Sequence, residues 1–274
     1  MSRDSNAPPQ GDPRISPTAY ATAAAWAHYG FAEAEAWDSR RGRTMLGALR
    51  CGTRALSPIF PALAPGEALL YWRHYWFSAW VARIAPSLAI EIGAGLSTRG
   101  LAYARAHPET RWHDLDLPGM VATRRASPAG PPPANYHLAV GDLLGDDLGA
   151  QIAAPAHGPV VALTEGVVDY LNRDAKQRAW AHIAALLKRL GGGRYLTEVY
   201  PLRRFAPRGP SAALARRWAA RPGSTLCYHE DQALAGLEAA GFARARVLPD
   251  TELPGVAYGP RGSQRAFCLL EAET

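Results

Sequence analysis

A glycine-rich turn, Gly93–Gly95, follows the largely apolar run Leu88–Ile92 and leads into sequence that can form a helix. Such an apolar run predicts a buried parallel strand. Glycine lets the backbone turn sharply and approach a ligand closely. A helix that begins near Ser97 and Thr98 offers unpaired backbone N–H groups to an electron-rich group. Because open α/β sheets bind ligands at the carboxyl ends of their strands, this stretch predicts a site for a nucleotide-like cofactor.

The type of cofactor is a separate question, because a Gly-x-Gly turn after a strand serves both nicotinamide dinucleotides and S-adenosylmethionine. The dinucleotide fingerprint needs a third small residue, and Thr98 stands at that position. Glu91, near the end of the strand, would repel a pyrophosphate but suits a cofactor that carries an ammonium and a sulfonium. These residues favour S-adenosylmethionine, with a nicotinamide cofactor as the alternative.

The acidic residue Asp116 follows a second predicted strand, Arg111–Leu115, about 20 positions beyond the glycine turn. At the tip of the neighbouring strand, a carboxylate can accept hydrogen bonds from both hydroxyls of an adenosine ribose. Asp114 is the local alternative, and we expect its side chain to face solvent. Asp116 is therefore the predicted ribose ligand.

Two further predicted strands also end at acidic residues. Asp142 follows Tyr136–Val140, and Glu165 follows Val160–Thr164, with Tyr170 a turn further on. The carboxyl ends of parallel strands meet at one edge of the sheet. We therefore expect both acids to line the same cleft, with Asp142 near the amino group of an adenine.

One arginine lies on the apolar stripe of a helix predicted over residues 67–85. Arg73 shares this stripe with Trp76, Trp80 and Ile84. Its side chain either extends along the helix to reach solvent, which the sequence alone slightly favours, or meets an anion in a cleft. His74 and His229 could act as bases, but neither has a visible partner in the sequence, so we assign no catalytic base.

Strands and helices alternate along the chain in an order that defines the fold class. After the four strands above, we predict a helix capped by Asn172, a strand over 194–200, a helix over 231–240, and strands near 245–248 and over 266–271. Two strands joined by a loop without a helix must pair antiparallel. The prediction is a Rossmann-like α/β sheet of seven strands, mostly parallel, with the last strand antiparallel.

The chain is divided by composition into three parts. Residues 1–15 are polar and proline-rich and are predicted to be a disordered tail. Residues 16–86 form a predicted N-terminal helical cap, because Tyr20, Ala24, Ala27 and Phe31 recur at helical spacing. Residues 87–274 form the cofactor-binding core, interrupted at 201–223 by a basic, arginine-rich insertion.

Charge and composition exclude several classes of protein. The 274 residues carry a net charge of +6, but the only lysines are Lys176 and Lys188, and the arginines are scattered. The sequence lacks the dense basic stripe that would predict a nucleic-acid partner. It also lacks an apolar run long enough to predict a membrane span. The three cysteines lack metal-binding spacing. We expect a cytoplasmic protein with no metal site and no membrane partner, and leave a homodimer open.

With these residues in place, the sequence resembles class I S-adenosylmethionine-dependent methyltransferases. Within that class it is similar to the leucine carboxyl methyltransferase-like family, which includes O-methyltransferases of polyketide pathways. Four motifs carry the resemblance, at Glu91–Gly100, Asp116–Pro118, Val140–Leu143 and Thr164–Leu171. One departure is Ser97, where the family usually has an aspartate.

The resemblance implies a role for each matching residue. Gly93, Ala94 and Gly95 would line the methionine part of the cofactor, Asp116 the ribose, Asp142 and Leu143 the adenine, and Glu165 the wall behind, beside Glu91. Arg73 and Tyr170 would lie where the cofactor meets the substrate and would carry the catalytic roles, with Arg73 also touching the cofactor.

The resemblance further implies an enzyme that methylates an oxygen of a small molecule, such as a secondary metabolite. We expect a carboxylate acceptor, giving a methyl ester, because a carboxylate is already ionised at neutral pH and needs only orientation. A hydroxyl acceptor is the alternative. A non-catalytic regulator or partner subunit that binds S-adenosylmethionine would keep the same binding residues and is the competing interpretation.

Overall fold

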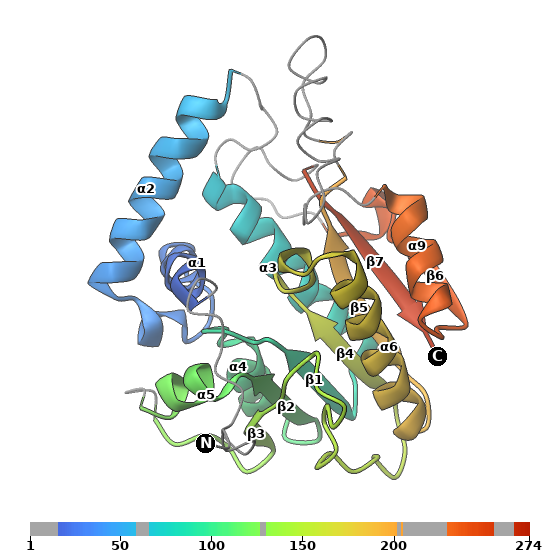
Figure 1. Cartoon of the computed structure of the whole chain (residues 1–274). Coiled ribbons are helices and arrows are strands. Elements are labelled where there is room, and N and C mark those ends of the chain that lie inside the picture. The colour runs from blue at the N-terminus through green and yellow to red at the C-terminus, as the bar shows by residue number, and fades with distance from the viewer. Residues whose placement is uncertain (1–15, 59–65, 127–129, 202–203, 205–228, 255–265) are drawn as a thin grey trace, which may run out of the picture.

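The fold is taken from a computed structural model that describes residues 16–58, 66–126, 130–201, 204, 229–254 and 266–274 (Figure 1). The predicted tail at 1–15 lies outside these residues. So does the predicted insertion at 201–223, apart from residues 201 and 204. No described helix is both long and apolar enough to cross a membrane.

A single seven-stranded sheet forms the centre of the described chain, in the order β3-β2-β1-β4-β5-β7-β6. The strands are β1 (Leu88–Ile92), β2 (Arg111–Asp116), β3 (Tyr136–Val140), β4 (Val160–Thr164), β5 (Arg194–Val199), β6 (Arg244–Val247) and β7 (Cys268–Glu273). Only β7 runs antiparallel to its neighbours, β5 and β6. The predicted fold class is confirmed.

The last strand lies two residues later than predicted. Its pairing with β5 aligns Val199 with Cys268 and Arg194 with Glu273. The sequence interpretation began this strand at Ala266 because the apolar run begins there, but Ala266 and Phe267 are buried ahead of the ladder. Hydrogen bonding to β5, rather than the apolar run, sets the bounds of β7.

Helices cover both faces of the sheet and extend beyond it. They are α1 (Ser16–His28), η1 (Ala34–Trp37), α2 (Arg40–Leu56), α3 (Gly66–Ile84), α4 (Arg99–Ala106), α5 (Pro118–Arg125), η3 (Val168–Tyr170), α6 (Arg173–Arg189), α9 (Glu230–Ala239) and η4 (Asp250–Glu252). As predicted, Asn172 caps α6, since its side chain accepts a hydrogen bond from the N–H of Ala175. The sequence interpretation missed α5, which starts at a proline in its first turn.

The two faces of the sheet are packed by different helices. On one face, α6 and α9 bury Trp180, Ile183 and Leu237 against β1, β4, β5 and β7. On the other face, α3 buries Trp76 and Trp80, among others, against β1, β4 and β5. Although the sequence interpretation grouped α3 with the N-terminal cap, this helix is one layer of the sheet packing, whereas α1 and α2 stand to the side of it (Figure 1).

Candidate active site

The glycine turn after β1 adopts a conformation that glycine favours. Gly93 has φ +69° and Gly95 has φ +55°, both in the left-handed region. A Cβ atom on Gly93 would lie 2.6 Å from Cγ2 of Val167, so the turn lies directly against the loop after β4. At Gly95 the nearest atom would be the Cβ of Ala19 in α1, at 3.6 Å. The turn is therefore closely packed at Gly93 and more open at Gly95.

Asp116 lies at the tip of β2, beside this turn. Its Oδ2 accepts a hydrogen bond of 2.6 Å from the N–H of Gly95, and its Oδ1 accepts one of 2.7 Å from the N–H of Leu117. Burial raises the pKa of Asp116, and the two N–H groups oppose that effect. Each carboxylate oxygen can accept more than one hydrogen bond, so this side chain retains capacity for two ligand hydroxyls.

Asp114 does not face solvent, which contradicts the expectation from the sequence. It is fully buried, and Oδ2 contacts Arg124 Nη2 and the hydroxyl of Tyr136, both at 2.6 Å. Its Oδ1 accepts from Nε1 of Trp112 at 2.7 Å. Asp114 is thus a structural anchor between β2 and α5, and its partners leave Asp116 as the acid beside the glycine turn.

Asp142 and Leu143 follow β3, as expected. Oδ1 of Asp142 accepts a hydrogen bond of 2.9 Å from the N–H of Leu144, which fixes the turn. The side chain of Leu143 is buried in the hydrophobic core under α6. Their predicted contact with an adenine stays a prediction.

Arg73 points into the protein, toward the ends of β4 and β5. Its Nε donates to Oε1 of Glu165 at 3.0 Å, and its Nη1 donates to the hydroxyl of Tyr200 at 2.9 Å. Only 11% of the side chain is exposed, so it does not extend to solvent along the helix. Tyr200, Glu165 and Glu198 raise the pKa of Arg73 despite burial, which opposes the charge. The anions that Arg73 meets are the protein's own carboxylates.

A second buried arginine, Arg99, links Glu91 to Glu165. Its Nη1 lies 2.7 Å from Oε1 of Glu91, and its Nη2 donates to Oε2 of Glu165. Its Nε donates to Oγ of Ser78 at 3.0 Å. Burial alone would raise the pKa of Glu165, but Arg99, His74 and Arg73 hold it well below the usual range. Glu91 therefore contacts Arg99 directly; burial raises the pKa of Glu91 to about 8 and Arg99 opposes that rise. Its predicted contact with the cofactor stays a prediction.

His74 lies inside this cluster and is neutral. Its Nδ1 lies 2.7 Å from Nη2 of Arg99, which donates, and 3.0 Å from Oε2 of Glu165, which accepts, so the tautomer of the ring decides which of the two contacts is a hydrogen bond. Burial, and then Arg99, lower the pKa of His74 to about 4. The rings of Trp26 and Phe31 lie 4.1 and 4.7 Å from the imidazole, centroid to centroid. Because it is buried and its pKa is lowered, His74 is a weak base at neutral pH.

Tyr170 lies on η3, at the surface. Its side chain is 46% exposed, and its hydroxyl donates to Oγ1 of Thr18 in α1 at 3.3 Å. The phenol that contacts Arg73 is Tyr200. The predicted role of Tyr170 beside Arg73 stays a prediction.

The sequence interpretation missed three members of the cluster, Arg99, Glu198 and Tyr200. Glu198 carried a usable signal, because it is a lone acid within the apolar strand β5, as Glu91 is within β1. In a strand, alternate residues share a face, and both acids fall on the α3 side. Arg99 gave no comparable signal, since its partner Glu165 is 66 residues away.

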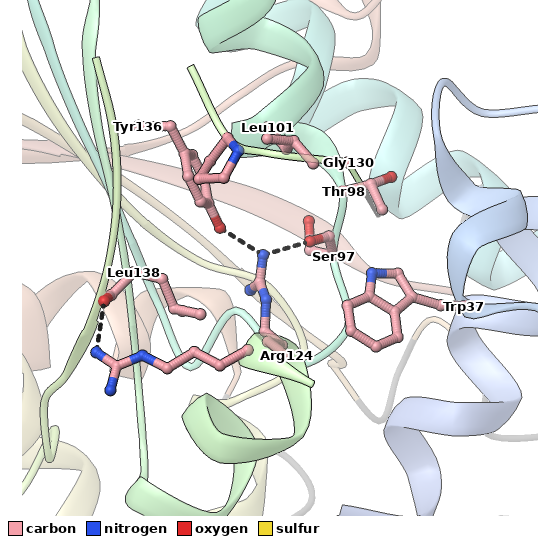
Figure 2. A pocket seen from close by; sticks show the side chains of 10 residues that line it. Trp37, Ser97, Thr98, Leu101, Arg124, Gly130, Tyr136 and Leu138 are labelled. Atoms are coloured by element: carbon pink, nitrogen blue, oxygen red, sulfur yellow. Dashed lines mark hydrogen bonds between the residues drawn. The ribbon is translucent and has the colours of Figure 1, made fainter. Parts of the chain in front are cut away.

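A cavity of about 320 Å³ is lined by residues of η1, α4, α5 and β3 (Figure 2). Ser97, Thr98, Trp37 and Tyr136 contribute to its lining. Arg124 also lines it, but its donors are directed to Tyr136 and the carbonyl of Ser97 (Figure 2) and to Asp114. The guanidinium of Arg124 is therefore already bound within the protein, whereas the second arginine of the lining, Arg125, is exposed and donates to the carbonyl of Leu138 at 3.4 Å.

Comparison with known proteins gives a likeness in fold. No protein-family model and no curated protein sequence matches the chain. A candidate methyltransferase from Thermobifida fusca YX has a TM-score of 0.58 over 93% of each chain, at 14% identity. This chain has the Rossmann-like methyltransferase fold. The narrower resemblance to the leucine carboxyl methyltransferase-like family stays a prediction.

Two longer proteins are also similar. A candidate O-methyltransferase from Nostoc punctiforme PCC 73102 has a TM-score of 0.44 at 15% identity, over 82% of this chain and 60% of its own. An O-methyltransferase family protein from Burkholderia thailandensis has a TM-score of 0.49 at 16% identity, over 88% of this chain and 62% of its own. The chain thus spans about three fifths of the length of these two proteins.

Proposed function

We propose that this protein transfers a methyl group from S-adenosylmethionine to an oxygen atom of a small molecule. The observation that carries the proposal is the arrangement at the ends of β1 and β2. There, the N–H of Gly95 in the left-handed turn donates to Asp116, whose carboxylate can accept further hydrogen bonds. A turn and an acid in this relation fit a nucleoside whose ribose hydroxyls both donate to one carboxylate.

The remaining predicted residues would hold the other parts of the cofactor. In the proposal, Gly93, Ala94 and Gly95 face the methionine part, Asp142 and Leu143 the adenine, and Glu91, Glu165 and Arg73 lie behind them. Gly93 already touches Val167, so the loop after β4 would form the wall next to the methionine part. When bound, the cofactor supplies a methyl group on a sulfonium that is a good leaving group, and the protein's task is orientation.

Thr98 supports this cofactor over a nicotinamide dinucleotide. Its side chain is buried at the start of α4, and its hydroxyl donates to the carbonyl oxygen of Ala32 at 2.8 Å. The dinucleotide fingerprint uses a small residue here, so that helix and strand pack closely around a pyrophosphate. A buried, hydrogen-bonded threonine at this position disfavours such close packing around a pyrophosphate.

The contacts of Arg73 bear on the acceptor. We expected this arginine to grip a substrate carboxylate, but Glu165 at 3.0 Å and Glu198 at 3.6 Å already offset its charge. A second anion would have to compete with these buried acids. The geometry therefore favours a hydroxyl acceptor, which Arg73, Tyr200 or Tyr170 could orient by hydrogen bonds, over a carboxylate.

Incubation with methyl-labelled S-adenosylmethionine tests the proposal. A panel of phenols, alcohols and carboxylic acids is offered, and products are separated into base-labile esters and base-stable ethers. Ether formation supports the proposal as stated, and ester formation would restore the carboxylate acceptor. Tight cofactor binding without transfer to any acceptor would favour the non-catalytic binding protein, and failure to bind the cofactor would overturn the proposal.

A further inference from the structure

Carboxylates outnumber cations in the buried cluster behind the glycine turn. Among the described residues, salt bridges link the acids Glu91, Glu165 and Glu198 to the cations Arg73 and Arg99, and the separate pair of Asp169 and Lys176 adds one charge of each sign. His74 is neutral, so it adds no positive charge to offset the excess of carboxylates. If every acid were ionised, the cluster would hold one uncompensated negative charge in a buried place.

Three of the four acids have a cation within direct contact. Glu91 lies 2.7 Å from Arg99, Asp169 lies 2.7 Å from Lys176, and Glu165 contacts both arginines. Glu198 is the exception, because its closest cation is Nη1 of Arg73 at 3.6 Å, beyond hydrogen-bond range. Glu198 therefore has the weakest compensation.

The hydrogen bonds of Glu198 lead to the same conclusion. Its Oε1 accepts a hydrogen bond of 2.6 Å from the N–H of Gly166. Its Oε2 is buried and has no hydrogen-bond partner within the described part of the chain. An ionised oxygen buried without a donor is far more costly than a neutral carboxyl group. Glu91, by contrast, has both oxygens within reach of partners, Arg99 and Ser97.

The charged and titratable groups around Glu198 also keep it protonated. Burial raises the pKa of Glu198 to about 8; Arg73 opposes this rise, while Asp169 and Glu165 add to it. Tyr195 on the same strand and Tyr200 directly after it have pKa values raised by burial and stay neutral at neutral pH. Burial raises the pKa of Glu91 to about 8 as well, but Glu91 has Arg99 at 2.7 Å, whereas Glu198 has no cation within hydrogen-bond range and one oxygen without a donor in the described part of the chain. The geometry therefore assigns the proton of the cluster to Glu198.

Glu198 is close to the place where the cofactor would bind. It holds the N–H of Gly166, and the next residue, Val167, is the one that packs against Gly93 of the glycine turn. S-adenosylmethionine carries a sulfonium, an ammonium and a carboxylate, and so a net charge of +1. Its demethylated product carries none. A cation held in a site of low dielectric favours the ionised form of a nearby acid over several ångströms.

We propose that Glu198 releases its proton when S-adenosylmethionine binds, and that the positive charge of the cofactor takes the place of that proton in the cluster. The inference rests on the proposed function for its ligand. When the methyl group is transferred, the sulfur becomes neutral and Glu198 takes up a proton again. With a hydroxyl acceptor, the O–H proton lost as the ether forms balances this uptake.

Isothermal titration calorimetry at pH 7.0 in phosphate and in imidazole buffer measures the proton released, because the two buffers differ in ionisation enthalpy. With a pKa of about 8, Glu198 is about 90% protonated at pH 7. We expect the wild-type protein to release roughly 0.9 proton on binding S-adenosylmethionine, and much less on binding S-adenosylhomocysteine. The affinity for S-adenosylmethionine should rise about tenfold from pH 6 to pH 7.

Glu198→Gln is the decisive variant, since an amide can still accept from Gly166 but cannot titrate. It should bind S-adenosylmethionine with no proton release and with an affinity that does not depend on pH, whereas Glu198→Asp should keep the release. Release that persists in the Gln variant would assign the proton to Glu91 or Asp116 and overturn the proposal.

The wild-type protein alone also decides the matter if the Gln variant does not fold. Binding of S-adenosylmethionine without proton release would overturn this inference and leave the proposed function intact. No binding of the cofactor at all would instead overturn the proposed function, so the two failures are distinguishable.

Discussion

Replacement of Asp116 by alanine tests the core of the cofactor site. Its carboxylate holds the N–H groups of Gly95 and Leu117 and has one further acceptor position on each oxygen. If both positions receive ribose hydroxyls, the variant loses two hydrogen bonds to a charged group, each of which contributes about 1.5 to 3 kcal/mol. Taking the lower value for both, we expect a loss of about 3 kcal/mol, or roughly 150-fold in affinity.

Calorimetric titration with S-adenosylhomocysteine measures this loss. Asp146→Ala is the matched control, because that carboxylate is fully exposed in the loop after β3. Thermal melts are needed alongside, since the loss of two backbone hydrogen bonds also loosens the glycine turn. A folded Asp116→Ala protein with the affinity of the control would refute the reasoning and remove Asp116 from the ribose site.

Three further predictions concern the same region. Gly93→Ala should destabilise the protein by about 3 kcal/mol, because its φ of +69° and the 2.6 Å approach to a neighbouring side chain both oppose a Cβ. Urea titration measures the loss. The control is Gly47→Ala, where no atom of the described chain lies within 4 Å of the added Cβ, and this variant should be neutral or slightly stabilising. Equal stabilities of the two variants would contradict the prediction. Arg73→Ala should lower stability by about 3 to 5 kcal/mol by leaving Glu165 with one arginine fewer. The rate of methyl transfer should fall as well. Arg73→Lys should restore only part of the stability and of the rate, since an ammonium lacks the planar fork of a guanidinium. Full recovery with lysine would mean that only the positive charge matters. Between pH 4.5 and about 8 the folded protein keeps a proton on Glu198 that the unfolded chain loses. The contribution of Glu198 to stability should therefore fall by up to about 1.4 kcal/mol per pH unit as the pH rises, and in urea titrations the stability of the wild-type protein relative to Glu198→Gln should fall with that slope across the range. Parallel curves for the two proteins would assign the slope to other groups.

Local patterns in the sequence determined most of the secondary structure. The bounds of β1, β3 and β4 agree with the predicted strands, because each is a short apolar run between polar or glycine-rich segments. The cap at Asn172 and the glycine turn after β1 were predicted for the same reason, since both depend on residues within a few positions of one another. The order of these elements was enough to give the fold class.

Tertiary structure alone decided the composition of the buried cluster. Arg73 meets Glu165 across 92 residues and Tyr200 across 127, and no periodicity links positions so far apart. The sequence placed Arg73 on an apolar stripe but did not show whether it would meet a ligand or acids of the protein itself. Asp114 was assigned to solvent for the same reason, because its partner Arg124 lies on a helix that the sequence did not reveal.

The bounds of β7 show the same limit on a smaller scale. An apolar run marks where a strand can form, but hydrogen bonds to β5 decide where it does form. The protonation of Glu198 depends in turn on burial and on the charges that the fold collects around it. The sequence therefore determined which elements form and which acids end the strands, whereas packing in three dimensions determined which charges meet and which of them stay ionised.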